Sequence, residues 1–186
     1  STIQICLQGG ITYYIQVDGA DPAVLEGHQG YFDIRITEIP PIPVPGNDSL
    51  CNATALGNPW TAPITILNQH NLCADDWDDP APQAFDTDKT VWYSFTTPVT
   101  GGPFAIDITG TSDLPWPFGV DAVDLQLAVY ESSNNACTGT LNEMGSSYSL
   151  TDFFNESINV RCLEEGRTYF IMVDGSLVNS QGYFDL

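Results

Sequence analysis

The stretch Cys162-Leu-Glu-Glu-Gly-Arg-Thr-Tyr-Phe-Ile-Met-Val-Asp-Gly175 gives the clearest indication of the fold. Tyr169, Ile171 and Val173 occupy every second position in it, and aromatic and β-branched residues favour strands. The run stops at Asp174-Gly175, a pair of residues typical of turns. We therefore expect a β-strand that ends in a turn at this pair.

The same stretch occurs near the start of the chain. Residues 6–19 read Cys-Leu-Gln-Gly-Gly-Ile-Thr-Tyr-Tyr-Ile-Gln-Val-Asp-Gly, 156 positions upstream. A second block, Gln181-Gly-Tyr-Phe-Asp-Leu186, matches Gln29-Gly-Tyr-Phe-Asp-Ile34 at a distance of 152 positions, because the intervening loop is four residues shorter. Two matching blocks in the same order identify an internal repeat, with a first copy and a second copy.

The repeat divides the chain into three parts. We expect residues 1–39 to be the C-terminal strands of a preceding or strand-exchanged repeat, and residues 47–186 to be a nearly complete unit. The first copy continues through Arg35-Ile-Thr-Glu-Ile39, residues that have no counterpart after Leu186. Between the copies, residues 40–46 alternate prolines with other residues, a pattern that favours an extended polyproline II linker.

Other segments of the unit show the same period of two. Residues 91–96, 104–109 and 125–130 carry apolar side chains at every second position, which predicts half-buried strands. No stretch has a helical period, and clusters of Gly, Pro, Asn and Ser separate the strands. The sequence therefore predicts an all-β protein, an antiparallel β-sandwich of about eight strands.

Charge and composition exclude several classes of protein. The 186 residues include 24 acidic and only 4 basic side chains, for a net charge of −20, which excludes a nucleic-acid partner and an anionic membrane surface. A hydrophobic share of 42% excludes a disordered acidic tail. No apolar run approaches the roughly 20 residues of a membrane span. We expect a folded, acidic domain without a membrane span.

Five cysteines lack the Cys-x-x-Cys spacing of metal sites and favour an oxidising, extracellular setting. Cys6 and Cys162 are equivalent in the repeat, so one unit holds Cys51, Cys73, Cys137 and Cys162, which we expect to form disulfides. Pairing of Cys51 with Cys73 and of Cys137 with Cys162 is favoured, and the other two pairings remain open. Cys6 would then pair with a residue upstream, or stay a free buried thiol.

Six aspartates lie within 14 residues of one loop. They are Asp75, Asp76, Asp78, Asp79, Asp86 and Asp88. Carboxylate oxygens are the ligands that Ca²⁺ prefers, although the spacing is not that of an EF-hand. The cluster is therefore a candidate Ca²⁺ site, and the alternative is a solvated acidic surface.

Enzyme motifs are missing from the sequence. It has two histidines and no His-Glu-x-x-His, no Gly-x-Ser-x-Gly and no phosphate-binding glycine loop. His28 corresponds to Ser180 in the second copy, and His70 near Cys73 is expected to be a structural loop residue. A glycosidase needs only two carboxylates, but 24 acidic residues give that idea no discriminating power. We expect a protein that is not an enzyme.

Three tryptophans and three asparagines are candidates for contact with sugar. Trp60, Trp77 and Trp116 lie in proline-rich loops and are candidates for stacking on glycans, or for covering the sandwich. The acceptor pattern Asn-x-Ser/Thr marks Asn47, Asn52 and Asn155 as candidate N-glycosylation sites.

Several segments of the unit carry a family resemblance. They are Asn47–Ala53, Thr90–Pro98, Asp124–Glu131, Thr168–Gly175 and Gly182–Asp185. Together they resemble the pre-peptidase C-terminal-like (PPC-like) β-sandwich repeats of large secreted adhesins and surface-fibre proteins of Bacteroidetes-type bacteria. The resemblance covers most of residues 47–186, and residues 1–34 carry its last two segments again. It also implies O-glycosylation at Ser49, within Asp48-Ser49-Leu50. Residues 74–82 depart from the family pattern, so nothing is carried over to them.

The resemblance and the repeat together imply a role. We expect a structural module on the bacterial cell surface, one unit of an extracellular fibre or adhesin, with Ca²⁺ and glycosylation as candidate additions. Its expected partners are other copies, through residues 1–39 or as tandem neighbours. The alternative is a carbohydrate- or cell-surface-binding accessory module of a secreted enzyme, and a hydrolase built on acidic pairs ranks third.

Overall fold

The computed structural model describes residues 7, 9–17, 31–36, 43–99, 101–112, 123–149, 155–176 and 180–186. The chain divides into a small unit, Ile5–Pro41, and a large unit that contains Ile42–Leu186. Among the described residues, no helix has the length and apolar character needed to cross a bilayer.

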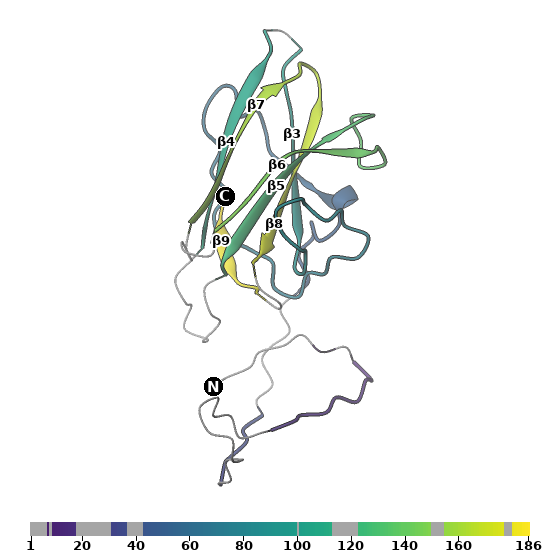
Figure 1. Ribbon diagram of the computed structural model, residues 1–186, viewed down its shortest axis with the longest axis vertical. Helices are drawn as coiled ribbons and strands as arrows, with labels where there is room; N and C mark the ends of the chain where they lie inside the picture. The colour runs from purple at the N-terminus through teal and green to yellow at the C-terminus, as the bar shows by residue number, and fades with distance from the viewer. Residues whose placement is uncertain are drawn as a thin grey trace. The chain divides into compact units, whose positions relative to one another are not determined.

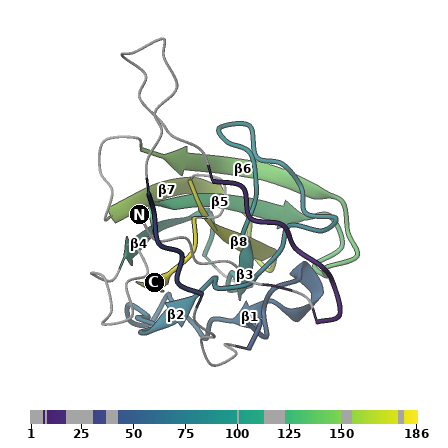
Figure 2. The same cartoon turned by 90° about the horizontal axis from the view of Figure 1, so that it is seen from below.

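The large unit is a sandwich of two β-sheets (Figure 1), as the sequence predicts. Its strands are β1 (Thr54–Ala55), β2 (Gln69–His70), β3 (Val91–Thr96), β4 (Phe104–Ser112), β5 (Leu125–Ser132), β6 (Leu141–Tyr148), β7 (Asn155–Leu163), β8 (Thr168–Gly175) and β9 (Tyr183–Asp185). One sheet has the order β1-β3-β8-β5-β6 and the other the order β2-β9-β4-β7. Figure 2 shows the sandwich from below. A single turn of 3-10 helix, η1 (Leu50–Asn52), precedes β1.

The stretch 168–175 forms β8, the central strand of the five-stranded sheet. It pairs antiparallel with β3 through Tyr93↔Ile171 and with β5 through Leu127↔Val173. The predicted turn at Asp174-Gly175 is wrong, because both residues belong to β8 and pair with β5. The strand pairs of this five-stranded sheet are antiparallel, except that β1 pairs with β3 in parallel over two residues.

The two sheets differ in how their strands are buried. β4 and β7 alternate buried and exposed residues, as half-buried strands should. β3, β5 and β8 are buried on both faces, so the prediction of half-burial is wrong for them. Their inner face joins the core between the sheets, and their outer face forms a second cluster of Trp92, Ala128, Tyr130, Phe170 and Met172. Leu50, Phe85 and Leu141 cover this outer cluster.

A disulfide fastens the start of the large unit to the β5–β6 hairpin. Cys51 in η1 bonds with Cys137, across 86 residues of sequence. Both predicted pairings are therefore wrong, and Cys162 is an exposed free thiol. Cys51 reaches Cys137 because η1 and the hairpin meet over the outer cluster, whereas Cys162 lies near the end of β7 in the other sheet. Cys73 also takes part in a disulfide.

The described part of the small unit contains the first copy of the repeat without regular strands. Residues 11–17 and 31–36 adopt no strand pairing, and their side chains are exposed. Cys6 and His28 lie outside the described residues. That residues 1–39 belong to a preceding or exchanged repeat stays a prediction.

Candidate functional site

The acidic loop, residues 74–90, lies over the outer cluster of the five-stranded sheet. Phe85 packs against that cluster, and the Tyr130 hydroxyl donates a hydrogen bond to the Pro80 carbonyl over 3.3 Å. Two aspartates, one in the loop and one in β8, hold the loop in place.

Asp79 is the aspartate of the loop that turns inward. Its carboxylate accepts hydrogen bonds from the Thr90 hydroxyl and, over 3.1 Å, from the indole N–H of Trp92. Burial raises the pKa of Asp79 to about 6, against the lowering effect of these two bonds. The Asp79 side chain thus joins the acidic loop to Trp92 on the outer face of β3.

Asp174 in β8 anchors the C-terminal end of the acidic loop. Its carboxylate is fully buried and accepts the backbone N–H groups of Lys89 at 2.7 Å and of Asp88 at 3.2 Å. Gln126 donates to the same carboxylate at 3.4 Å. Burial raises the pKa of Asp174 to about 6, although the backbone hydrogen bonds act to lower it. The equivalent Asp18 lies outside the described residues.

The remaining candidate Ca²⁺ ligands make separate local contacts. Asp75 accepts the N–H of Trp77, Asp76 accepts the Thr87 hydroxyl, and Asp88 lies 3.9 Å from the Lys89 ammonium. Asp78 and Asp86 are exposed. Within the described ranges no group of three or more His, Cys, Asp or Glu side chains is arranged to hold a metal ion. The structure therefore does not bring the six aspartates together as a coordination group.

The candidate sugar-stacking tryptophans lie in different environments. Trp60 is half-buried, with ring centroids 4.8 Å from Phe104 and 6.3 Å from Phe95, and its indole donates to the Thr96 carbonyl. It covers the sandwich, which is the alternative role predicted for it. Trp77 is 81% exposed in the acidic loop, and Trp116 lies outside the described residues.

The candidate glycosylation sites divide into one buried and three exposed positions. Asn47 is buried and donates its amide to the Trp92 carbonyl at 2.9 Å, so a glycan there would have to displace this contact. Asn52, Asn155 and Ser49 are exposed. The Asn52 amide donates to the Ser49 hydroxyl at 3.0 Å.

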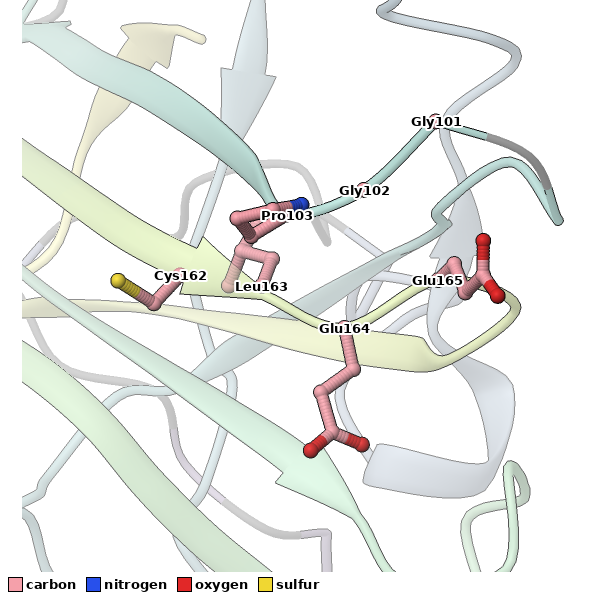
Figure 3. A pocket seen from close by; sticks show the side chains of 7 residues that line it. All are labelled: Gly101, Gly102, Pro103, Cys162, Leu163, Glu164 and Glu165. Carbon is pink, nitrogen blue, oxygen red and sulfur yellow. The ribbon is translucent and has the colours of Figure 1, made fainter.

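An open hollow of about 430 Å³ lies where β7 ends. It is lined by Gly101, Gly102, Pro103, Cys162, Leu163, Glu164 and Glu165. In Figure 3 the thiol of Cys162 and the carboxylates of Glu164 and Glu165 point in different directions. Polar groups that diverge cannot act on one substrate atom, because catalysis needs them within hydrogen-bond reach of it.

His70 is held in β2 and faces β9. Its ring lies 5.6 Å from that of Tyr183, in an edge-to-face arrangement, and its Nδ1 atom is buried without a hydrogen-bond partner. Burial lowers the pKa of His70. These are the surroundings of a packed side chain at a strand pair.

Asn71 was missed by the sequence reasoning. Its amide is fully buried and donates to the carbonyls of Lys89 and Ser180, while its carbonyl accepts the N–H of Gly182. It thereby joins the acidic loop to the segment that leads into β9. No pattern in the sequence distinguishes this asparagine from an ordinary loop residue.

Comparisons with protein-family models, with curated proteins and with solved structures found no match to this chain. The Cys51–Cys137 disulfide is typical of proteins from an oxidising environment. The chain is an all-β protein whose large unit is a two-sheet sandwich.

Proposed function

We propose that this protein is a structural module of an extracellular bacterial surface fibre or adhesin, in which β-sandwich units join head to tail or as tandem neighbours. The observation that supports the proposal best is the contrast between the two copies of the repeat. The same strand motif is buried in the second copy and exposed in the first.

Equivalent residues differ widely in exposure. Ile171 is 1% exposed, whereas Ile15, its equivalent in the first copy, is 63% exposed. Phe184 is 0% exposed, and its equivalent Phe32 is 65% exposed. Full burial of such a side chain stabilises a fold by roughly 1.5–3 kcal/mol. The first copy thus presents several apolar side chains whose burial would be favourable.

Partner strands account for the burial of the second copy. β8 lies between β3 and β5, and β9 lies between β2 and β4. A segment with the same sequence fits the same surroundings, so the natural partner of the first copy is another unit of this kind. Residues 1–39 are accordingly the C-terminal strands of a preceding or strand-exchanged repeat.

Other features agree with an extracellular position on the cell surface. The disulfide needs an oxidising environment, and a net charge of −20 keeps an elongated assembly soluble. Four of the five segments that resemble PPC-like repeats lie on β3, β5, β8 and β9, and the fifth, Asn47–Ala53, contains η1. Residues 43–46 continue the proline-rich linker, which would space successive units.

Light scattering and electron microscopy of the isolated protein test the proposal. We expect assemblies that grow with protein concentration and have the repeat of one sandwich unit. The variant Phe32→Asp should reduce assembly, because it places a charge on the exposed apolar face, while Thr12→Ala serves as the matched control. Monodisperse monomers at every concentration would contradict a self-associating module.

One observation favours the second candidate, a carbohydrate-binding accessory module. Trp77 is 81% exposed, and such a ring can stack on a sugar. Glycan-array binding that is lost in Trp77→Ala and kept in Trp60→Phe would support this role. An array without any signal would remove it.

A further inference from the structure

We propose that the Tyr31–Ile36 segment of one molecule replaces β9 in a second molecule and extends along the edge of β4 that no described strand covers. The inference rests on the proposed self-association and names its partner surface and register. The occupant is a second copy of this chain.

Three contacts hold β9 in the sandwich. Phe184 is fully buried in the core, the Tyr183 ring packs against His70, and the Asp185 carboxylate accepts the N–H of Asn68 at 2.8 Å. The first copy contains Tyr31, Phe32 and Asp33 in the same order. All three contacts can therefore form again with the segment from another molecule, so the exchange loses none of them. Exchange of identical elements is a low-cost route to association.

The edge of β4 beside β9 is largely unpaired. β4 pairs with β7 from Phe104 to Thr111, but with β9 only at Thr111 and Ser112. In the described part of the sheet, no strand pairs with Phe104–Gly110 on the β9 side. Such an edge presents backbone N–H and C=O groups to any further strand.

The register of β9 fixes where the incoming residues would lie. Thr111 pairs with Asp185, the equivalent of Asp33, so continuing the antiparallel ladder places Arg35 opposite Thr109 and Ile36 opposite Ile108. Ile108 is buried in the core. Ile36, which is 79% exposed in its own molecule, would gain a core neighbour at this position.

Charge also favours this register. Thr109 and Asp107 are exposed on the outer face of β4, and Arg35 would lie opposite the first and diagonal to the second. Diagonal neighbours on one face of a sheet are within reach of long side chains. Asp107 already accepts a hydrogen bond from the Asn159 amide, which keeps its carboxylate on this face. One of only four cations in the chain would thus meet an acidic surface.

The first-copy segment is long enough to follow β4 past the β9 position. Its sequence continues through Arg35 and Ile36, the residues that the register places along β4. Each molecule both offers this segment and accepts one. A contact of this head-to-tail kind propagates into filaments when it does not close on itself.

Disulfide trapping between two molecules tests the register. Both proteins carry Cys162→Ser, which removes the exposed free thiol; one adds Arg35→Cys and the other Thr109→Cys. The two are mixed as full chains and oxidised gently. We expect a heterodimer on a non-reducing gel that disappears on reduction.

The matched control replaces Thr109→Cys by Ala105→Cys, which is exposed on the same strand four residues away. That distance is roughly 13 Å along a strand, beyond the Cα separation of about 4.4–6.8 Å that a disulfide allows. The control pair should give at least fivefold less heterodimer.

The outcomes separate this inference from the proposed function. Equal trapping at positions 109 and 105, or no trapping while the unmodified protein still assembles, would overturn the exchange and leave self-association standing. Trapping only within a single molecule that carries Arg35→Cys and Thr109→Cys together would overturn the choice of a second molecule. Monomers without any trapping would remove both proposals.

Discussion

The two copies of the repeat have similar sequences but lie in different structural environments. In Thr168–Gly175 the motif is a strand with neighbours on both sides, and its side chains are buried. In residues 11–17 the motif forms no strand in the described part of the chain, and its side chains are exposed. The alternating pattern therefore allows a segment to join a β-sheet, but its side chains become buried only when partner strands pair with it.

The largest effect is expected from a charge placed on the motif. Ile171→Asp buries a carboxylate in the core and should destabilise the large unit by about 4–5 kcal/mol or more, enough to unfold it. The equivalent change Ile15→Asp should leave its stability unchanged and weaken assembly. Chemical denaturation and light scattering on both variants measure this. Equal losses of stability would mean that the first copy is also part of a core.

Removing the disulfide should have the next largest effect on the large unit. The double variant Cys51→Ser with Cys137→Ser should lose about 4–5 kcal/mol on the chain-entropy model, because the bond closes a loop of 86 residues. Cys162→Ser is the control and should melt like the unmodified protein, since this thiol is exposed and free. A stable double variant would show that packing over the outer cluster suffices.

The pH dependence of stability should reflect Asp174. Its pKa is raised from 3.8 to about 6 by burial, so the folded state holds a proton more tightly than the unfolded state between these values. Stability contributed by the protonated form is therefore lost as pH rises from about 4 to about 6, by about 2–3 kcal/mol. Because burial also raises the pKa of Asp79 to about 6, Asp174→Asn should remove only part of this decline, and Asp78→Asn at the surface should remove none of it. Denaturation midpoints measured across this pH range test the sign.

The smallest loss of stability is expected from replacing an asparagine of the N-glycosylation pattern, and Asn47 and Asn52 should differ. Asn47→Ala removes the buried hydrogen bond to the Trp92 carbonyl and should cost about 1–2 kcal/mol. Asn52→Ala, on the surface, should stay within about 0.5 kcal/mol. Thermal melts resolve the difference. If expression in a glycosylating host adds sugar at Asn47, the burial of this side chain is wrong.

Local patterns predicted the strands that the two-residue period describes. The segments 91–96, 104–109, 125–130 and 168–175 lie in β3, β4, β5 and β8, because alternation follows directly from the pleat of a strand. The sandwich followed from the number of such strands. Burial of β3, β5 and β8 on both faces was not predictable in this way, since their cover comes from η1 and the acidic loop.

Contacts between distant segments account for the other errors. An Asp-Gly pair usually marks a turn, but Asp174 stays in β8 because its buried carboxylate accepts two N–H groups of the acidic loop. The recurrence of this aspartate as Asp18 was the available clue to a structural constraint. The six clustered aspartates stay a candidate metal site, since spacing along a loop does not determine which way each carboxylate points.

The Cys51–Cys137 bond also determines how the protein would respond to tension. A load that enters through residues 43–46 reaches Cys51 almost at once and crosses the bond to Cys137, so it bypasses residues 52–136. Those residues would span roughly 290 Å if fully stretched, at about 3.4 Å per residue. That length cannot be drawn out while the bond is intact. The unit therefore limits its own extension, and a reducing agent would lengthen it without a change in sequence.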